Sequence, residues 1–76
     1  MISFPRITRD PAVMGGKACI RGMRVTVDMI LGELGAGTTT DELLAGYPYL
    51  ERDDVLEAVC YGVGLAQGRD TDPAAT

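Results

Sequence analysis

Apolar residues in the second half of the chain recur at three- and four-residue spacing, which is the period of helices packed on one face. The first of these runs follows Thr26, whose hydroxyl can cap a helix, and stops at the Gly-Ala-Gly stretch of residues 35–37. We therefore predict a helix between these two signals. Its buried side would be formed by Val27, Ile30, Leu31 and Leu34.

A second, shorter helix is predicted directly afterwards. Thr39 and Glu42 lie three residues apart, as in a capping box, where each side chain accepts the other residue's free backbone N–H. The two leucines at 43–44 supply the buried side of this helix. Gly46 ends it after about two turns, and Pro48 prevents its continuation.

A third helix is predicted to start near Glu51 or Arg52. Asp53 and Asp54 would then lie in its first turn, where acids interact favourably with the helix dipole and face the solvent. Gly62 indicates a close contact with another helix. The buried face is predicted to run through the apolar residues at helical spacing, which are Val55, Leu56, Val59, Cys60 and Val63.

Residues 5–27 follow a different pattern, in which short β-prone pieces alternate with turn residues. Ile7 begins a candidate edge strand, and the Gly-Gly pair at 15–16 marks a turn. Residues 19–20 and 25–27 are again β-prone. This pattern predicts short strands or extended pieces, with a hairpin among them.

Together these patterns predict a mainly α fold in one domain over residues 1–68. An N-terminal short β hairpin or extended segment, residues 1–27, precedes a three-helix bundle of the helix-turn-helix outline, residues 27–68. Residues 69–76 are polar and contain proline, and we expect them to form a flexible tail.

Composition narrows the class of protein. The chain has 76 residues, of which 46% are apolar, as in an ordinary small globular domain. Its apolar stretches are far shorter than the roughly 20 residues that cross a bilayer. No signal-peptide pattern opens the sequence, so we expect a cytoplasmic protein without membrane contact. Cys19 and Cys60 lie in different predicted elements and are expected to be reduced, partly buried thiols.

The residue types give little support to catalysis. The chain has no histidine, which is the commonest general base and the commonest metal ligand. Its single serine, Ser3, lies near the N-terminus. A phosphate-binding loop is also disfavoured, because Ala18 follows Lys17 where that motif needs serine or threonine. We expect no enzymatic activity, no metal and no cofactor.

Charge is distributed very unevenly. The net charge is −4, but residues 1–26 carry +4 and residues 27–76 carry −8. The basic first third is therefore the best candidate for contact with nucleic acid or with an acidic protein surface. The candidate contact residues are Lys17, Arg21, Arg24, Arg6 and Arg9.

Three interpretations of Arg21 and Arg24 remain open. They could contact phosphates, pair with the helix acids of the same chain, or meet the acidic helices of a second subunit. The helix acids in question are Asp28, Asp53, Asp54 and Glu57. Base reading by the third helix is disfavoured, because the acids at its start would face phosphates.

From Arg6 to about Ala66 the sequence resembles the domain of unknown function 433 family. The stretches "ITRDPAVMGGKACIRGMRVTV" and "ILGELGAGTTTDELLAGYPYLERDDVLEAV", with Tyr61 after them, carry the resemblance in order and spacing. Ala18, Met23 and Glu51 depart from the family's usual proline, threonine and capping serine or threonine.

The resemblance implies a homeodomain-like helix-turn-helix core behind an N-terminal β element. It also implies an antitoxin role, since members of the family look like VapB-type partners of a PIN-like nuclease toxin. By that likeness the chain would bind and inhibit a PIN-like toxin protein and contribute to operon regulation at operator DNA. We also expect a homodimer, because a chain this short buries a modest core that a second copy would help to stabilise. A stand-alone homodimeric DNA-binding regulator and a structural or assembly domain are the alternatives.

Overall fold

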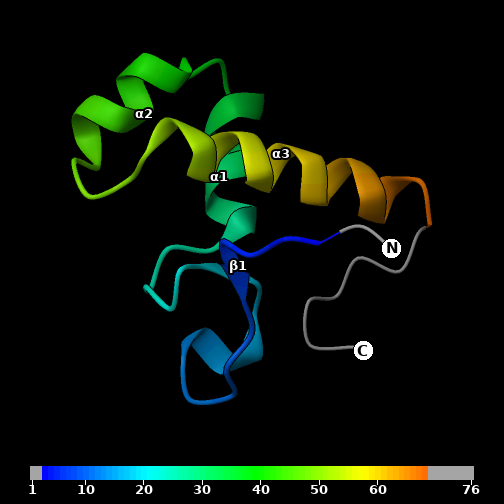
Figure 1. Cartoon of the computed structure of the whole chain (residues 1–76). Helices are drawn as coiled ribbons and strands as arrows, with labels where there is room; N and C mark the ends of the chain where they lie inside the picture. Colours follow the sequence, from blue (N-terminus) through cyan, green and yellow to red (C-terminus); the bar gives the residue numbers. More distant parts are fainter. Residues whose placement is uncertain (1–2, 69–76) are drawn as a thin grey trace.

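The computed structural model of the chain describes residues 3–68. Two short strands and a single 3-10 turn precede three helices, so the mainly α fold with an N-terminal β element is confirmed (Figure 1). The predicted tail of residues 69–76 lies outside the described residues. In chain order the elements are β1 (Ile7–Thr8), η1 (Met14–Gly16), β2 (Cys19–Ile20), α1 (Val27–Gly35), α2 (Thr40–Gly46) and α3 (Arg52–Ala66).

The β segment is held together by an antiparallel pair and a tight turn. β1 pairs with β2 so that Ile7 lies opposite Ile20. After β2 the chain reverses at Arg21 and Gly22, where the Met23 N–H donates to the Ile20 carbonyl at 2.8 Å. Both central residues have positive φ angles, 46° and 73°, as in the primed turns that suit strand twist.

The first two helices begin where the sequence signals place them. The Thr26 hydroxyl accepts the Met29 N–H at 3.0 Å and caps α1. At α2 the predicted capping box is complete, because Thr39 N–H donates to the Glu42 carboxylate and Glu42 N–H donates to the Thr39 hydroxyl. Hydrogen bonding to the Glu42 carboxylate by the backbone of Thr39, and then by its side chain, lowers the pKa of Glu42.

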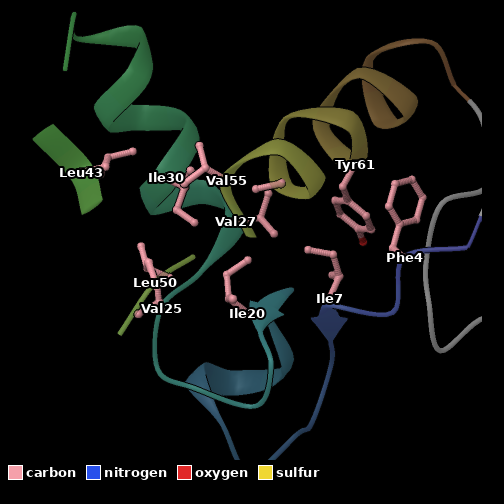
Figure 2. Packing of buried hydrophobic residues seen from close by; sticks show 11 residues of the cluster. Phe4, Ile7, Ile20, Val25, Val27, Ile30, Leu43, Leu50, Val55 and Tyr61 are labelled. Carbon is pink, nitrogen blue, oxygen red and sulfur yellow. The ribbon is translucent and has the colours of Figure 1, made fainter. Parts of the chain in front are cut away.

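One apolar core joins the β segment to the helices. Phe4 packs edge-to-face on Tyr61 of α3, with ring centroids 5.2 Å apart, and Ile7 lies close to this pair (Figure 2). The β segment is therefore part of the core. The buried apolar residues that form this core are Phe4, Ile7, Ile20, Val25, Val27, Ile30, Leu43, Leu50, Val55, Ala58 and Tyr61.

The predicted close contact at Gly62 is confirmed. A Cβ atom at this position would lie 2.7 Å from Leu31 Cδ1, so only a glycine lets α3 approach α1 here without moving that side chain. Gly62 and Tyr61 thus lie on the side of α3 that faces α1 and the β segment.

The predicted buried face of α3 is mostly wrong. Val55 is buried as expected, but Leu56 is 61% exposed, Val63 is 46% exposed, and Cys60 is also exposed. Cys60 is therefore not the partly buried thiol expected from the sequence, whereas Cys19 is 1% exposed. The side that turns inward carries Asp54, Val55, Ala58, Tyr61 and Gly64.

Candidate functional site

The first turn of α3 holds a carboxylate with no exposed surface. Asp54 is 0% exposed and accepts a bidentate pair from Arg21, with Nε to Oδ1 at 3.0 Å and Nη2 to Oδ2 at 2.8 Å. Arg6 Nη1 donates to Oδ1 at 2.9 Å, and the Glu51 N–H donates to Oδ2 at 2.9 Å. Every oxygen of this buried acid is thus satisfied by charged or backbone donors.

The two arginines extend the same cluster toward the surface. Arg6 Nη1 also lies 2.6 Å from a Glu51 carboxylate oxygen, and the Arg6 backbone N–H donates to the Glu57 carboxylate. Arg21 Nη2 donates to the Tyr49 carbonyl at 2.9 Å. We call Arg6, Arg21 and Asp54 the arginine clasp, because it ties the β segment to the start of α3.

The electrostatics of the arginine clasp favour the charged forms. Burial alone would raise the pKa of Asp54, but this is outweighed by hydrogen bonds, first from Arg21, then from the Glu51 N–H. Arg6 adds to them, and the pKa is held at about 2. In return, hydrogen bonds to these acids raise the pKa of both arginines, so all three groups stay ionised near neutral pH.

Arg21 adopts a backbone conformation that residues with a Cβ atom rarely adopt. Its φ of 46° lies in the left-handed region, next to Gly22 in the same turn. This geometry carries the guanidinium to Asp54 while the Arg21 N–H donates to the Arg6 carbonyl at 2.8 Å. The local strain is therefore balanced by the contacts that the turn makes possible.

These contacts correct the expectation for Asp54 and show which of the three interpretations applies to Arg21. Asp54 is not a solvated helix-start residue, because its side chain is fully buried. Pairing of Arg21 with the helix acids of the same chain, one of the three interpretations, is what the structure shows. Arg6, another candidate contact residue, is engaged in the same way.

The other three candidate residues remain at the surface. Arg24 is exposed and makes no hydrogen bond or ion pair with any of residues 3–68. Lys17 Nζ lies 3.4 Å from an Asp28 oxygen, and both side chains are largely exposed. Arg9 Nε donates to the Gly16 carbonyl at 3.1 Å. The structure thus separates the five predicted residues into two that bind the buried Asp54 and three that lie apart from it.

Arg9 and Lys17 stand beside an open surface hollow. The hollow has a volume of about 380 Å³ and lies between the β segment, α1 and α3. Its walls are mainly apolar and include Val27, Leu31 and Leu65. The sequence analysis singled out the two cations but did not find the hollow, because its walls come from three separate segments.

The outward face of α3 is the second surface that sequence reasoning missed. Leu56, Cys60 and Val63 follow one another at four- and three-residue spacing, so they form an exposed apolar stripe along the helix. Two exposed acids, Glu51 and Asp53, stand at its start, with side chains 59% and 74% accessible. Its signal was present in the sequence as an apolar helical run.

This arrangement offers surfaces for contact. Within residues 3–68 no three side chains of histidine, cysteine, aspartate or glutamate come together as a metal site would require. None of the helices described is long and apolar enough to cross a membrane. What the described surface does present is the apolar stripe, the hollow and Arg24.

Comparison with known proteins places these features in a family. The family described as "Protein of unknown function (DUF433)" matches residues 7–61. A crystal structure of a DUF433 member protein from Anabaena variabilis ATCC 29413 is similar, with a TM-score of 0.77 and 33% sequence identity. The likeness covers 83% of this chain and 62% of that protein, so the chain spans less than two thirds of its relative's length. Among curated proteins none matches the chain.

Proposed function

The chain belongs to the DUF433 family, and we propose that it is a non-catalytic, antitoxin-like module that binds and inhibits a PIN-like nuclease toxin. The observation that carries this proposal is the outward face of α3. Leu56 is 61% exposed and Val63 46% exposed, on a helix whose opposite side already packs on the core. Exposed apolar stripes of this kind mark surfaces that a protein partner covers.

The same face argues against DNA as the main partner of α3. Glu51 and Asp53 stand exposed at the helix start, where phosphates would lie if the helix entered a groove. Negative side chains there repel the backbone and remove the gain from counterion release. A partner with an apolar surface and basic groups at its edge fits the stripe better.

Inhibition would proceed by covering the nuclease rather than by a reaction. Arg24 is exposed and unpaired within residues 3–68, so its guanidinium is available to the acidic metal ligands that a PIN-like site would present. Arg21 is less suited to this role because it is bound to Asp54 and the Tyr49 carbonyl. Operon regulation would then belong to the complex of module and toxin.

The proposal is tested by purifying the chain together with the PIN-like protein of a neighbouring reading frame and measuring RNA cleavage. Leu56→Asp and Val63→Asp should each weaken inhibition by about tenfold or more, since both put a charge into the contact. Met14→Asp is the matched control, because Met14 is also an exposed apolar side chain, outside α3. Unchanged inhibition by both α3 variants would refute the proposed surface.

Arg24 is tested separately in the same assay. Arg24→Glu should abolish inhibition if this side chain meets the acidic site, whereas Lys17→Glu makes the same charge change at another exposed position. Equal effects of the two variants would mean that only the overall charge matters. The role proposed for Arg24 would then be wrong.

An assembly domain is the second candidate function, favoured by the same exposed stripe, which two copies of the chain could bury against each other. The mass of the isolated protein in solution separates the two cases. A dimer that Leu56→Asp dissociates would favour assembly, and a monomer that binds the nuclease would favour the antitoxin-like module.

A further inference from the structure

The turn that follows β2, residues 21–24, leaves one of its side chains without a partner and anchors the residues on both sides of it. Val25, directly after Arg24, is 4% exposed, and Met23, directly before it, is partly buried against the core. Arg24 itself is exposed and makes no hydrogen bond or ion pair with any of residues 3–68. A free guanidinium therefore stands on a short piece of backbone whose two neighbours are fixed.

The turn is closed by its own backbone and held by the start of α3. The Ile20 N–H donates to the Val25 carbonyl at 2.9 Å, and the Met23 N–H donates to the Ile20 carbonyl at 2.8 Å. The Arg21 guanidinium ties the turn to the buried Asp54. Arg21 has a φ of 46°, and strained conformations of this kind persist where the surrounding contacts over-determine them, which is common at binding sites.

A third attachment of the turn comes from β1. The Gly22 N–H donates to the Thr8 hydroxyl at 2.8 Å, although the two residues are 14 positions apart in sequence. Gly22 is exposed and Thr8 is only partly buried, so water can replace the hydroxyl as acceptor and the bond adds little to the stability of the fold. Its main consequence is to fix the turn relative to β1, two residues before Arg24.

We propose that Thr8 is a positioning residue, which together with Arg21 holds the backbone under Arg24 in the orientation that binds the partner. The inference rests on the proposed function, in which Arg24 meets the acidic metal ligands of a PIN-like nuclease. A side chain on a fixed turn loses less conformational freedom on binding than one on a mobile loop, so Thr8 adds affinity without touching the partner. Arg21 also supports the fold, so Thr8 is the residue that separates positioning from stability.

The experiment measures the dissociation constant of the full chain and the PIN-like nuclease of the neighbouring reading frame. Thr8→Val keeps the shape of the side chain but removes the acceptor, and it should weaken binding about fivefold, as the loss of one hydrogen bond would. Thr8→Ser keeps a hydroxyl and should restore the affinity. Thr38→Val is the matched control, because the Thr38 hydroxyl donates to Glu33 at 2.9 Å between α1 and α2, and it should leave binding unchanged.

Arg24→Ala shows whether Thr8 acts through Arg24. The apolar stripe of α3 is intact in this variant, so the remaining binding can be measured. Thr8→Val should weaken it no further, because the turn no longer carries the side chain that it positions. An equal loss with and without Arg24 would overturn the proposal, and so would unchanged binding by Thr8→Val in the chain that keeps Arg24.

Backbone amide relaxation of the free chain separates a failure of this inference from a failure of the proposed function. The order parameters of Gly22, Met23 and Arg24 should be about 0.85, as in rigid backbone, and should fall in Thr8→Val but not in Thr8→Ser. A turn that stays equally ordered in Thr8→Val would refute the positioning role. If the turn loosens as expected but the unchanged chain does not bind the nuclease, the proposed function is wrong and the positioning of Arg24 stands.

Discussion

The two faces of α3 each carry some residues that an ordinary amphipathic helix would place on the other face. The inward face begins with a fully buried carboxylate, Asp54, and continues through small residues such as Ala58 and Gly64. The outward face carries Leu56 and Val63, which are 61% and 46% exposed. A helix that buries one carboxylate and leaves two large aliphatic side chains exposed meets two requirements, one from the fold and one from a surface that a partner could cover.

The inward face shows that the fold depends on contacts between distant parts of the chain. Asp54 can be buried because Arg21 and Arg6, 33 and 48 positions away in sequence, both reach it. Without those partners a buried carboxylate would destabilise the domain strongly. The arginine clasp thus determines how the helix is rotated about its axis and leaves the apolar stripe outside.

The largest expected effect comes from removing Asp54. Asp54→Ala removes the buried carboxylate on which Arg6, Arg21 and the Glu51 N–H converge, and losing hydrogen bonds to a charged group destabilises proteins by about 1.5–3 kcal/mol. This is a large share of the stability of a domain of this size. Urea unfolding followed by circular dichroism measures the change. A loss below about 1 kcal/mol would show that the arginine clasp contributes little to the stability of the fold.

Acid should weaken the arginine clasp reversibly. The pKa of Asp54 in the folded chain, about 2, lies below the ordinary value of 3.8, so ionised Asp54 stabilises the fold above about pH 4. This contribution is lost as the pH falls from about 4 toward 2 and Asp54 takes up a proton. The urea midpoint should fall in this window, and the fall should be smaller in Asp54→Asn. Identical pH profiles of the two proteins would contradict the assignment.

Two substitutions of Arg21 separate the effect of backbone strain on stability from the effect of its side-chain contacts, and the expected difference is smaller. Arg21→Ala and Arg21→Gly both lose the bonds to Asp54 and Tyr49, but only glycine adopts a φ of 46° freely. The glycine variant should be more stable than the alanine variant by about 1 kcal/mol. Equal urea midpoints for the two variants would mean that the turn relaxes once the guanidinium is absent.

The smallest effect on stability is expected at the outward face. Leu56→Asp should change the free energy of unfolding by no more than about 0.5 kcal/mol, because a side chain that is already 61% exposed loses little burial. Val55→Asp, one residue earlier and 3% exposed, is the matched control and should prevent folding. If the two variants unfold at similar urea concentrations, the assignment of the faces is wrong.

The helix starts were predictable because their signals are local. Thr26 and the pair Thr39 and Glu42 satisfy backbone N–H groups within three residues, so the sequence around each start contains the whole interaction. The close contact at Gly62 was also predictable, since a helical glycine has few other uses. Local hydrogen bonds and steric needs can be recognised without knowing the fold.

The rotation of α3 was not predictable in the same way. Two apolar helical runs overlap on this helix, and the more hydrophobic one, through Leu56 and Val63, is the one that stays outside. The decision depends on Asp54 finding Arg6 and Arg21, and no spacing within α3 reports contacts over 33 or 48 positions. For the same reason the sequence identified the cations as a group but not which of them would bind the buried Asp54.

The central claim is that the outward face of α3 is open in the free chain and covered by the partner. The reactivity of Cys60 tests this claim most directly. Cys60 lies in the apolar stripe and is exposed, whereas Cys19 is 1% exposed. In the folded free protein a thiol reagent should therefore modify one cysteine at once and the second only on unfolding. Added PIN-like nuclease should slow the modification of Cys60 at least tenfold, in line with a buried contact. Protection of Cys60 in the free protein, or an unchanged rate in the complex, would contradict the account.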